Sequence, residues 1–169
     1  AYANRLERLD AANPPSRRDG SGLAFDAAND CLVLFGSQYD NDERTWVYRY
    51  ETNRWEAHDL TPRPPGRKTA TYASIPKMAY DPATRTILCV VRRDEAGGAH
   101  ETWSLDTAKL RWTKLSPAVE PEPSKSRSRN LDYSERHNVF LLETMAASGG
   151  PQVWTYRSAP PSGPAPLPA

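Results

Sequence analysis

Residues 45–55 read Thr-Trp-Val-Tyr-Arg-Tyr-Glu-Thr-Asn-Arg-Trp, and residues 102–112 read Thr-Trp-Ser-Leu-Asp-Thr-Ala-Lys-Leu-Arg-Trp. Both segments open with Thr-Trp and end on a second tryptophan, with turn-forming residues between the two aromatic positions. A shorter version, Val-Trp-Thr-Tyr, stands at residues 153–156. Self-similarity of this length indicates that the chain is built from repeated structural units.

The similarity extends upstream of the tryptophans. Three segments align without a gap: 23–35, 78–90 and 131–143. Phe25, Tyr80 and Tyr133 occupy the same position in them, at intervals of 55 and 53 residues. The chain therefore carries three copies of one unit.

Each copy has the pattern of a small antiparallel sheet. Short apolar runs rich in β-branched and aromatic residues alternate with Asp, Asn, Pro and Thr turns, and the runs are too short for helices. Four such strands per copy predict a propeller blade. One blade cannot bury both faces, so the tryptophans are expected to fill the space between stacked blades.

On these elements the chain resembles kelch-type repeats, the blade unit of kelch and galactose-oxidase-like β-propellers. The matching elements are Phe25-Asp26, Tyr80-Asp81, the strand end Val33-Leu34-Phe35-Gly36 and residues 45–55. The paired glycines of the family remain only as Gly36-Ser37, and the third copy has no second tryptophan. The resemblance implies an all-β fold, a partial propeller of about three four-stranded antiparallel blades.

The two ends of the sequence suggest an incomplete ring. Asn4-Arg5-Leu6-Glu7 echoes Asn53-Arg54-Trp55-Glu56, so residues 4–9 are expected to form an outer strand, while the third copy lacks one. The predicted divisions are an outer strand of a preceding or closing blade with a Pro-rich loop (1–19), three blades (20–60, 61–116, 117–157) and a Pro-rich tail or linker (158–169).

Three blades are too few to close around an axis. We therefore expect about half of a six- or seven-bladed ring, completed by a second copy, by another protein chain, or by the rest of a longer polypeptide. A sequence that starts with Ala1 suits a processed chain and weakly favours an exported protein, periplasmic or extracellular.

Composition excludes some partners. The formal net charge of +1 gives no overall attraction to nucleic acid or to an anionic membrane, and no apolar run is long enough for a membrane span. Cys31 and Cys89 fall on opposite faces of their strands in different blades, which favours two buried free thiols over a disulfide. No cofactor or metal is expected, because the three histidines share no ligand spacing.

Basic residues recur before the first strand of each copy and in the loops after the second strand. If they converge on one face, their guanidinium groups suit an anionic ligand or an acidic peptide. The alternative is that each arginine pairs with an acid or a carbonyl of its own blade. The candidate binding residues are Arg18, Arg67, Lys68, Arg127, Arg129, Tyr39, Arg92 and Arg93.

Catalytic patterns are scarce. The acidic run 40–43 is expected to be a solvent-exposed turn rather than a calcium loop, because adjacent residues cannot all point at one ion. No nucleophile elbow or Cys-His arrangement is present. Two functions remain open: a non-catalytic interaction or structural subunit of a larger assembly, and a part of a propeller enzyme or lectin acting on carbohydrate, whose site is completed by missing blades.

Overall fold

The fold is all-β. The computed structural model describes residues 6–37, 42–66, 75–92, 100–121, 129–146 and 148–158. In these residues no helix is present, so none has the length and apolarity to cross a membrane.

Three antiparallel sheets follow one another along the chain, as the repeats predict. The first sheet has the order β1 (Gly22–Asp26), β2 (Cys31–Phe35), β3 (Thr45–Arg49), β4 (Arg54–His58). The second has the order β5 (Lys77–Asp81), β6 (Thr86–Arg92), β7 (His100–Asp106), β8 (Arg111–Lys114). The third has the order β9 (Asn130–Ser134), β10 (Val139–Met145), β11 (Pro151–Tyr156), so its described part lacks a fourth strand.

Five hairpins use the same four-residue turn. The last turn residue adopts a positive φ in every one of them: Asp30, Asn53, Arg85, Leu110 and Asn138. Asparagine and aspartate tolerate this left-handed conformation better than other residues with a Cβ, which explains why three of the five positions hold them. The turn fixes the strand register, and the register is identical in the three β-hairpins that open the sheets.

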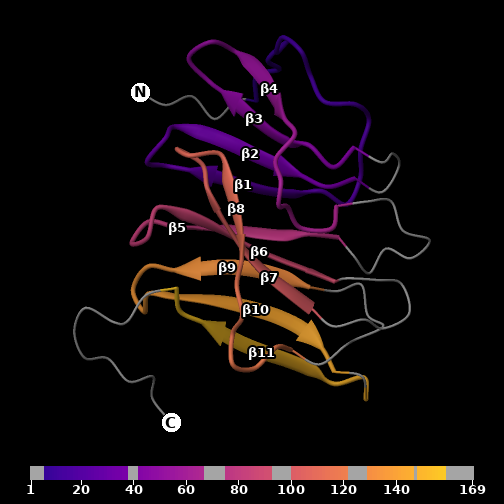
Figure 1. Cartoon of the computed structure of the whole chain (residues 1–169), viewed down its shortest axis with the longest axis vertical. Helices are drawn as coiled ribbons and strands as arrows, with labels where there is room; N and C mark the ends of the chain where they lie inside the picture. Colours follow the sequence, from indigo (N-terminus) through magenta and orange to yellow (C-terminus); the bar gives the residue numbers. More distant parts are fainter. Residues whose placement is uncertain are drawn as a thin grey trace.

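The sheets stack one on the next. The first strand of each sheet contacts the first strand of its neighbour, β1 against β5 and β5 against β9. Figure 1 shows the first sheet at the top, the second in the middle and the third at the bottom of the molecule. Each pair of neighbouring sheets therefore shares one layer of side chains.

The layer between the first and second sheets is the larger core. Trp112 lies almost fully buried in it, with its ring 5.3 Å from that of Phe35. The indole N–H of Trp112 donates to Oγ1 of Thr45 in the first sheet at 2.8 Å. This one outer-strand side chain fills apolar space and also satisfies its only polar group across the interface.

The two cysteines lie in this same layer. Cys31 and Cys89 are both buried and free, as predicted. Cys31 lies on the face of the first sheet that packs on the second sheet. Cys89 lies on the face of the second sheet that packs on the first, so the two thiols share one layer. Burial raises the pKa of the Cys31 thiol to about 11, so this thiol is protonated and unreactive at neutral pH.

A tyrosine and an aspartate join neighbouring sheets at the end of their first strands. The Tyr80 hydroxyl accepts from the amide of Ala28 at 3.2 Å and contacts the carboxylate of Asp26. Tyr133 lies against the Asp81 carboxylate in the same way, while its hydroxyl donates to Oδ1 of Asn138, and burial together with Asp81 raises the pKa of Tyr133 to about 12. Asp26 and Asp81 also accept from the amides of their own turns. We call this contact the Tyr–Asp pair.

The start of the chain lies beside the outer strand of the first sheet. Ala12 forms an isolated parallel bridge with Arg54, through bonds from Ala12 N to Asn53 O (2.9 Å) and from Trp55 N to Ala12 O (3.0 Å). Residues 6–11 are in no strand here, and residues 4 and 5 lie outside the described part. That residues 4–9 add an outer strand to another blade stays a prediction.

Candidate functional site

The face of the first sheet that points away from the second sheet is apolar, and no sheet of the described residues packs against it. Cross-strand partners and alternate residues share a face, so this outward face carries Leu23, Phe25, Leu32, Leu34, Tyr48 and Trp55. Leu23 and Phe25 are 50% and 51% exposed, and Tyr48 stacks on Trp55 at 5.2 Å.

The outward face matches a buried layer residue by residue. The aligned positions of the second sheet are Met78, Tyr80, Ile87, Cys89, Leu105 and Trp112. Five of these six are buried, because they pack against the first sheet, and Tyr80 is partly buried in the same core. The first sheet thus presents the side chains of an interface between blades where the described chain has no neighbouring blade. Exposed apolar area of this kind marks an interaction surface.

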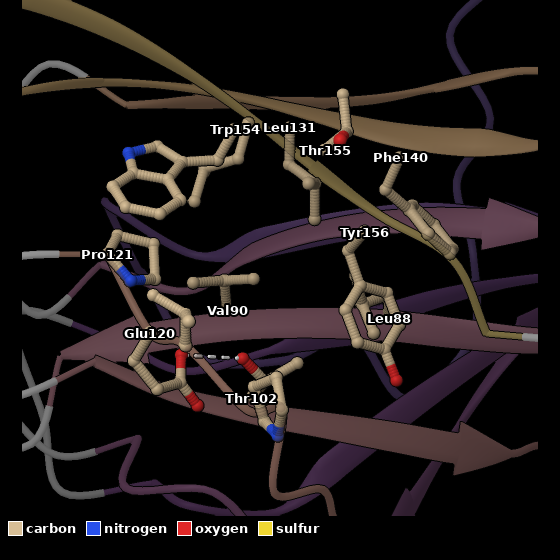
Figure 2. A pocket seen from close by; sticks show the side chains of 13 residues that line it. Leu88, Val90, Thr102, Glu120, Pro121, Leu131, Phe140, Trp154, Thr155 and Tyr156 are labelled. Atoms are coloured by element: carbon tan, nitrogen blue, oxygen red, sulfur yellow. Dashed lines mark hydrogen bonds between the residues drawn. The ribbon is translucent and has the colours of Figure 1, made fainter. Parts of the chain in front are cut away.

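A second unfilled position lies between the second and third sheets. A small hollow with a cavity volume of about 40 Å³, partly open to solvent, is lined by β6, β7, β9, β10, β11 and the segment 117–121. Figure 2 shows Trp154 and Tyr156 pointing into it from one side and Val90 and Thr102 from the other. Its walls are mainly aliphatic and aromatic.

The hollow between the second and third sheets corresponds to the place that Trp112 fills between the first and second sheets. Trp112 touches Phe35, Thr45 and its cross-strand partner Leu105. In the repeat alignment their equivalents are Val90, Thr102 and Tyr156, and all three line the hollow. The third sheet has no described outer strand, so no strand residue takes the place of the tryptophan.

One acidic group lies at the edge of the hollow. Oγ1 of Thr102 donates to the Glu120 carboxylate at 3.1 Å (Figure 2). Burial raises the pKa of Glu120, and the neighbouring Glu101 carboxylate adds to the effect. The hydroxyl that accepts the indole N–H in the first interface is therefore already engaged here, so an entering side chain needs no polar group.

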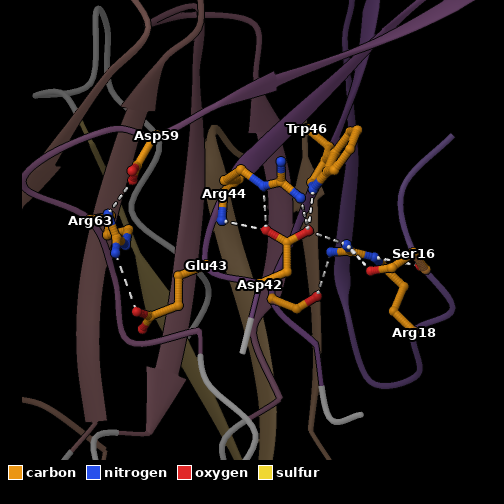
Figure 3. Close-up of polar contacts among 9 residues, drawn as sticks. Ser16, Arg18, Asp42, Glu43, Arg44, Trp46, Asp59 and Arg63 are labelled. Atoms are coloured by element: carbon orange, nitrogen blue, oxygen red, sulfur yellow. Dashed lines mark hydrogen bonds and ion pairs between the residues drawn. The ribbon is translucent and has the colours of Figure 1, made fainter. Parts of the chain in front are cut away.

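Of the predicted basic residues, Arg18 is held by its own sheet. It donates to Asp42 at 2.6 Å, and both side chains are only 7% exposed. Asp42 also accepts from Arg44 and from the indole N–H of Trp46, as Figure 3 shows. Arg18 thus has the intrablade pairing that was the alternative to ligand binding.

The same contacts overturn the expectation of a solvent-exposed turn at Asp42. Burial disfavours its ionised form, but the hydrogen bonds from Arg44, Arg18 and Trp46 outweigh burial and hold its pKa well below the ordinary value. Residues 40 and 41 lie outside the described part. The Trp46 contact is the signal that sequence inspection missed, since Thr45-Trp46 follows the acidic run with only Arg44 between them.

Arg92 and Arg129 lie near one another, at the end of β6 and just before β9. Both are buried, and Nη2 of Arg129 donates to the carbonyl of Ile75 at 3.1 Å. Burial and then Arg92 lower the pKa of Arg129 to about 10, and burial and then Arg129 lower the pKa of Lys77. These positions stay candidates for an anionic ligand.

His100 belongs to the same basic cluster. It is buried as the first residue of β7, opposite Arg92. Its Nδ1 lies 3.1 Å from the Pro121 carbonyl oxygen. Burial lowers its pKa, so His100 is neutral at pH 7.

The other predicted binding residues lie outside the described part of the chain: Arg67, Lys68, Arg127, Tyr39 and Arg93. Within the described ranges no three His, Cys, Asp or Glu side chains group in a way that would hold a metal ion. No protein-family model matches the sequence, and a search of curated proteins gives no match either.

Proposed function

We propose that this chain is a non-catalytic portion of a larger kelch-like propeller and serves as an interaction or structural subunit. Its role is to receive further strands and sheets from another segment or chain. The hollow between the second and third sheets carries the proposal. An outer strand with an apolar side chain belongs there by the repeat, and the described chain supplies none.

The outward face of the first sheet supports the same role from the other end of the molecule. It offers aromatic and aliphatic side chains in the register of an interface between blades. Burying such a face contributes roughly 25 cal/mol per Å² of apolar surface. The first-sheet end of the stack is therefore suited to contact with a further sheet.

An extended peptide fits as a fourth strand beside β11, the edge strand of the third sheet. Strand addition uses main-chain hydrogen bonds for affinity and side-chain pockets for specificity. Residues 4–9 have the sequence of an outer strand, with Leu6 at the position of Trp55 and Trp112 and fully exposed in this structure. The leucine side chain has no N–H to place, which suits a pocket whose Thr102 hydroxyl already has Glu120 as its partner.

The test uses a labelled synthetic peptide of residues 4–9 added to the full chain. We expect saturable binding by fluorescence anisotropy and slower hydrogen exchange at the amides of β11. A peptide with Leu6→Asp should bind about 10- to 100-fold more weakly, since burying a leucine contributes roughly 1.5–3 kcal/mol. The matched control is Glu7→Gln, which faces the other side of the strand and should change little.

Absence of binding, or equal binding by the Leu6→Asp peptide, would contradict the proposed role. Slower exchange at β4 in place of β11 would also contradict it, because the peptide would then occupy the edge that the start of the chain already uses.

A further inference from the structure

Residues 6–9 match the outer strand of the second sheet position by position. The aligned pairs are Leu6 with Trp112, Arg8 with Lys114, and Leu9 with Leu115. The contacts that this outer strand makes with β7 therefore show which residues of β11 the segment 6–9 would meet as a fourth strand of the third sheet.

Leu6 has its cross-strand partner in Tyr156. In the second sheet Trp112 lies opposite Leu105, and Tyr156 takes the place of Leu105 in the third sheet. Tyr156 points into the hollow, as Figure 2 shows. Leu6 is fully exposed in this chain, and Val119 at the hollow is 68% exposed. A leucine placed here would cover apolar surface on both sides of the contact.

The second and third sheets carry the same polar feature beside this position. In the second sheet the Trp103 indole donates to Glu101 at 3.0 Å, and the Lys114 ammonium lies 2.7 Å from Glu101 and 5.9 Å from the Trp103 ring. In the third sheet the Trp154 indole donates to Oε1 of Gln152 at 3.2 Å. The amide oxygen and the indole ring thus offer a cation the same two contacts.

Arg8 is the cation that the segment 6–9 would bring there. It holds the position of Lys114, so it would lie opposite Trp154. In this chain Arg8 pairs with Asp10, but both side chains are almost fully exposed, and an exposed ion pair of this kind adds little stability. Contact with an indole ring and an amide oxygen can replace it.

Leu9 has an apolar partner on the other face of β11. The amide of Leu115 donates to the Thr102 carbonyl oxygen at 2.8 Å, which sets these two residues opposite each other. Val153 takes the place of Thr102 in the third sheet. Leu9 and Val153 are 49% and 70% exposed, and directly opposed side chains on neighbouring strands pack together. The pairing would therefore bury two exposed apolar side chains.

The segment 6–9 of the same chain cannot reach β11. Asp10 is fastened to β4, because Asn53 Nδ2 donates to its carbonyl oxygen at 3.2 Å next to the bridge at Ala12. Leu9 therefore stays about 4 Å from Asp10, at the edge of the first sheet. Figure 1 shows β4 at the top and β11 at the bottom of the molecule, two sheets away, which is about 20 Å. Another molecule must supply the segment.

We infer that β11 receives residues 6–9 of a second copy of this chain, antiparallel, as the fourth strand of the third sheet. Two copies can exchange these segments reciprocally, which occupies both β11 edges and stops association at two. The exchange uses the edge strand β11, whereas the exposed Asp132 lies on β9 at the opposite edge of that sheet. This inference rests on the proposed function and names the partner.

Sedimentation of the full chain over a range of concentrations tests the exchange. The wild-type chain should reach a dimer of twice 18.9 kDa and stop there. Leu6→Asp should weaken the dimer by at least about tenfold, because it places a carboxylate in the apolar hollow. The matched control Leu6→Met keeps an apolar side chain of similar volume and should stay within a few-fold of wild type. Leu6 is exposed in the single chain, so neither variant should disturb folding.

A disulfide trap identifies the residues that meet. Full chains carrying Leu9→Cys and isotope-labelled full chains carrying Val153→Cys are mixed and oxidised, while the native thiols of Cys31 and Cys89 stay buried. Mass spectrometry should find a disulfide that joins position 9 of one chain to position 153 of the other. Tyr50→Cys, at an exposed turn, replaces Val153→Cys in the control and should give little product.

A chain that stays monomeric, association beyond two copies, a dimer unchanged by Leu6→Asp, or equal trapping at position 50 would overturn the inference. The proposed function has a separate readout in the peptide of residues 4–9. If that peptide protects β11 while the full chain stays monomeric, the interaction role stands and the second copy is the wrong partner.

Discussion

Asp42 is the residue on which the polar end of the first sheet depends. One carboxylate accepts from Arg18, from the backbone and side chain of Arg44, and from the indole N–H of Trp46. These donors come from the segment before β1, from the approach to β3 and from β3 itself. Arg18 and Arg44 also lie over the Trp46 ring.

The neutral substitution Asp42→Asn is expected to lower the free energy of unfolding by about 2–4 kcal/mol at pH 7, because it leaves the Arg18 guanidinium buried without its anion. The folded-state pKa of Asp42 lies below its unfolded value, so its stabilisation is present above about pH 4 and is lost as pH falls below that. Urea unfolding at pH 7 and at pH 3 measures both effects.

The matched control is Asp10→Asn, which removes an ion pair to Arg8 in which both side chains are almost fully exposed. An exposed pair of this kind should contribute less than about 1 kcal/mol. If Asp42→Asn cost the same at pH 3 as at pH 7, ionisation of Asp42 would not be the source of its effect.

The sequence identified Arg18 as a candidate for a polar contact, but it could not identify the residue that Arg18 contacts. Arg18 was a candidate for either a ligand or an intrablade pair, and the position of Asp42 beside Trp46 decides for the pair. His100 follows a glycine-containing run, which is typical of loops, yet it starts β7 and is buried. Its Nδ1 lies against the Pro121 carbonyl oxygen, which is distant in sequence, so no local pattern signals this contact.

At the scale of the elements, strand positions were predictable because turns and apolar runs repeat with the copies. The pairing order, the four-residue turns and the three-stranded third sheet all follow from that repeat. The hollow could not be predicted from the sequence. Its walls come from the second and third sheets together, and it becomes visible only when Val90, Thr102 and Tyr156 are seen to face one another.

The shared turn gives a prediction for one element. Arg85 holds a left-handed conformation with φ of 56° on an exposed hairpin. Arg85→Asn should raise the free energy of unfolding by about 0.5–1 kcal/mol, since asparagine adopts this conformation at lower cost. Thermal or urea unfolding measures the change.

Arg136→Asn serves as its control, because Arg136 is an exposed turn residue of the equivalent hairpin outside the positive-φ position. It should change stability by less than about 0.5 kcal/mol. Equal effects of the two substitutions would show that residue type, and not the left-handed turn, sets the stability.

At the scale of the whole molecule, three sheets share two buried layers and carry a third set of interface residues on the outward face of the first sheet. The aromatic repeat predicts the stack, and the Tyr–Asp pair shows how neighbours are joined. The role of Tyr80 and Tyr133 could be recognised only once the structure had shown that they reach the neighbouring sheet.

The central proposal to test is that a further sheet, supplied by a second copy of the chain, covers the outward face. Hydroxyl-radical footprinting of the full chain, read by mass spectrometry at high and low protein concentration, measures this directly. Oxidation of Phe25 and Trp55 should fall severalfold at high concentration, while Tyr50, a turn residue 69% exposed, should be oxidised equally at both. Oxidation of Phe25 that stays as fast as that of Tyr50 at every concentration would contradict the account.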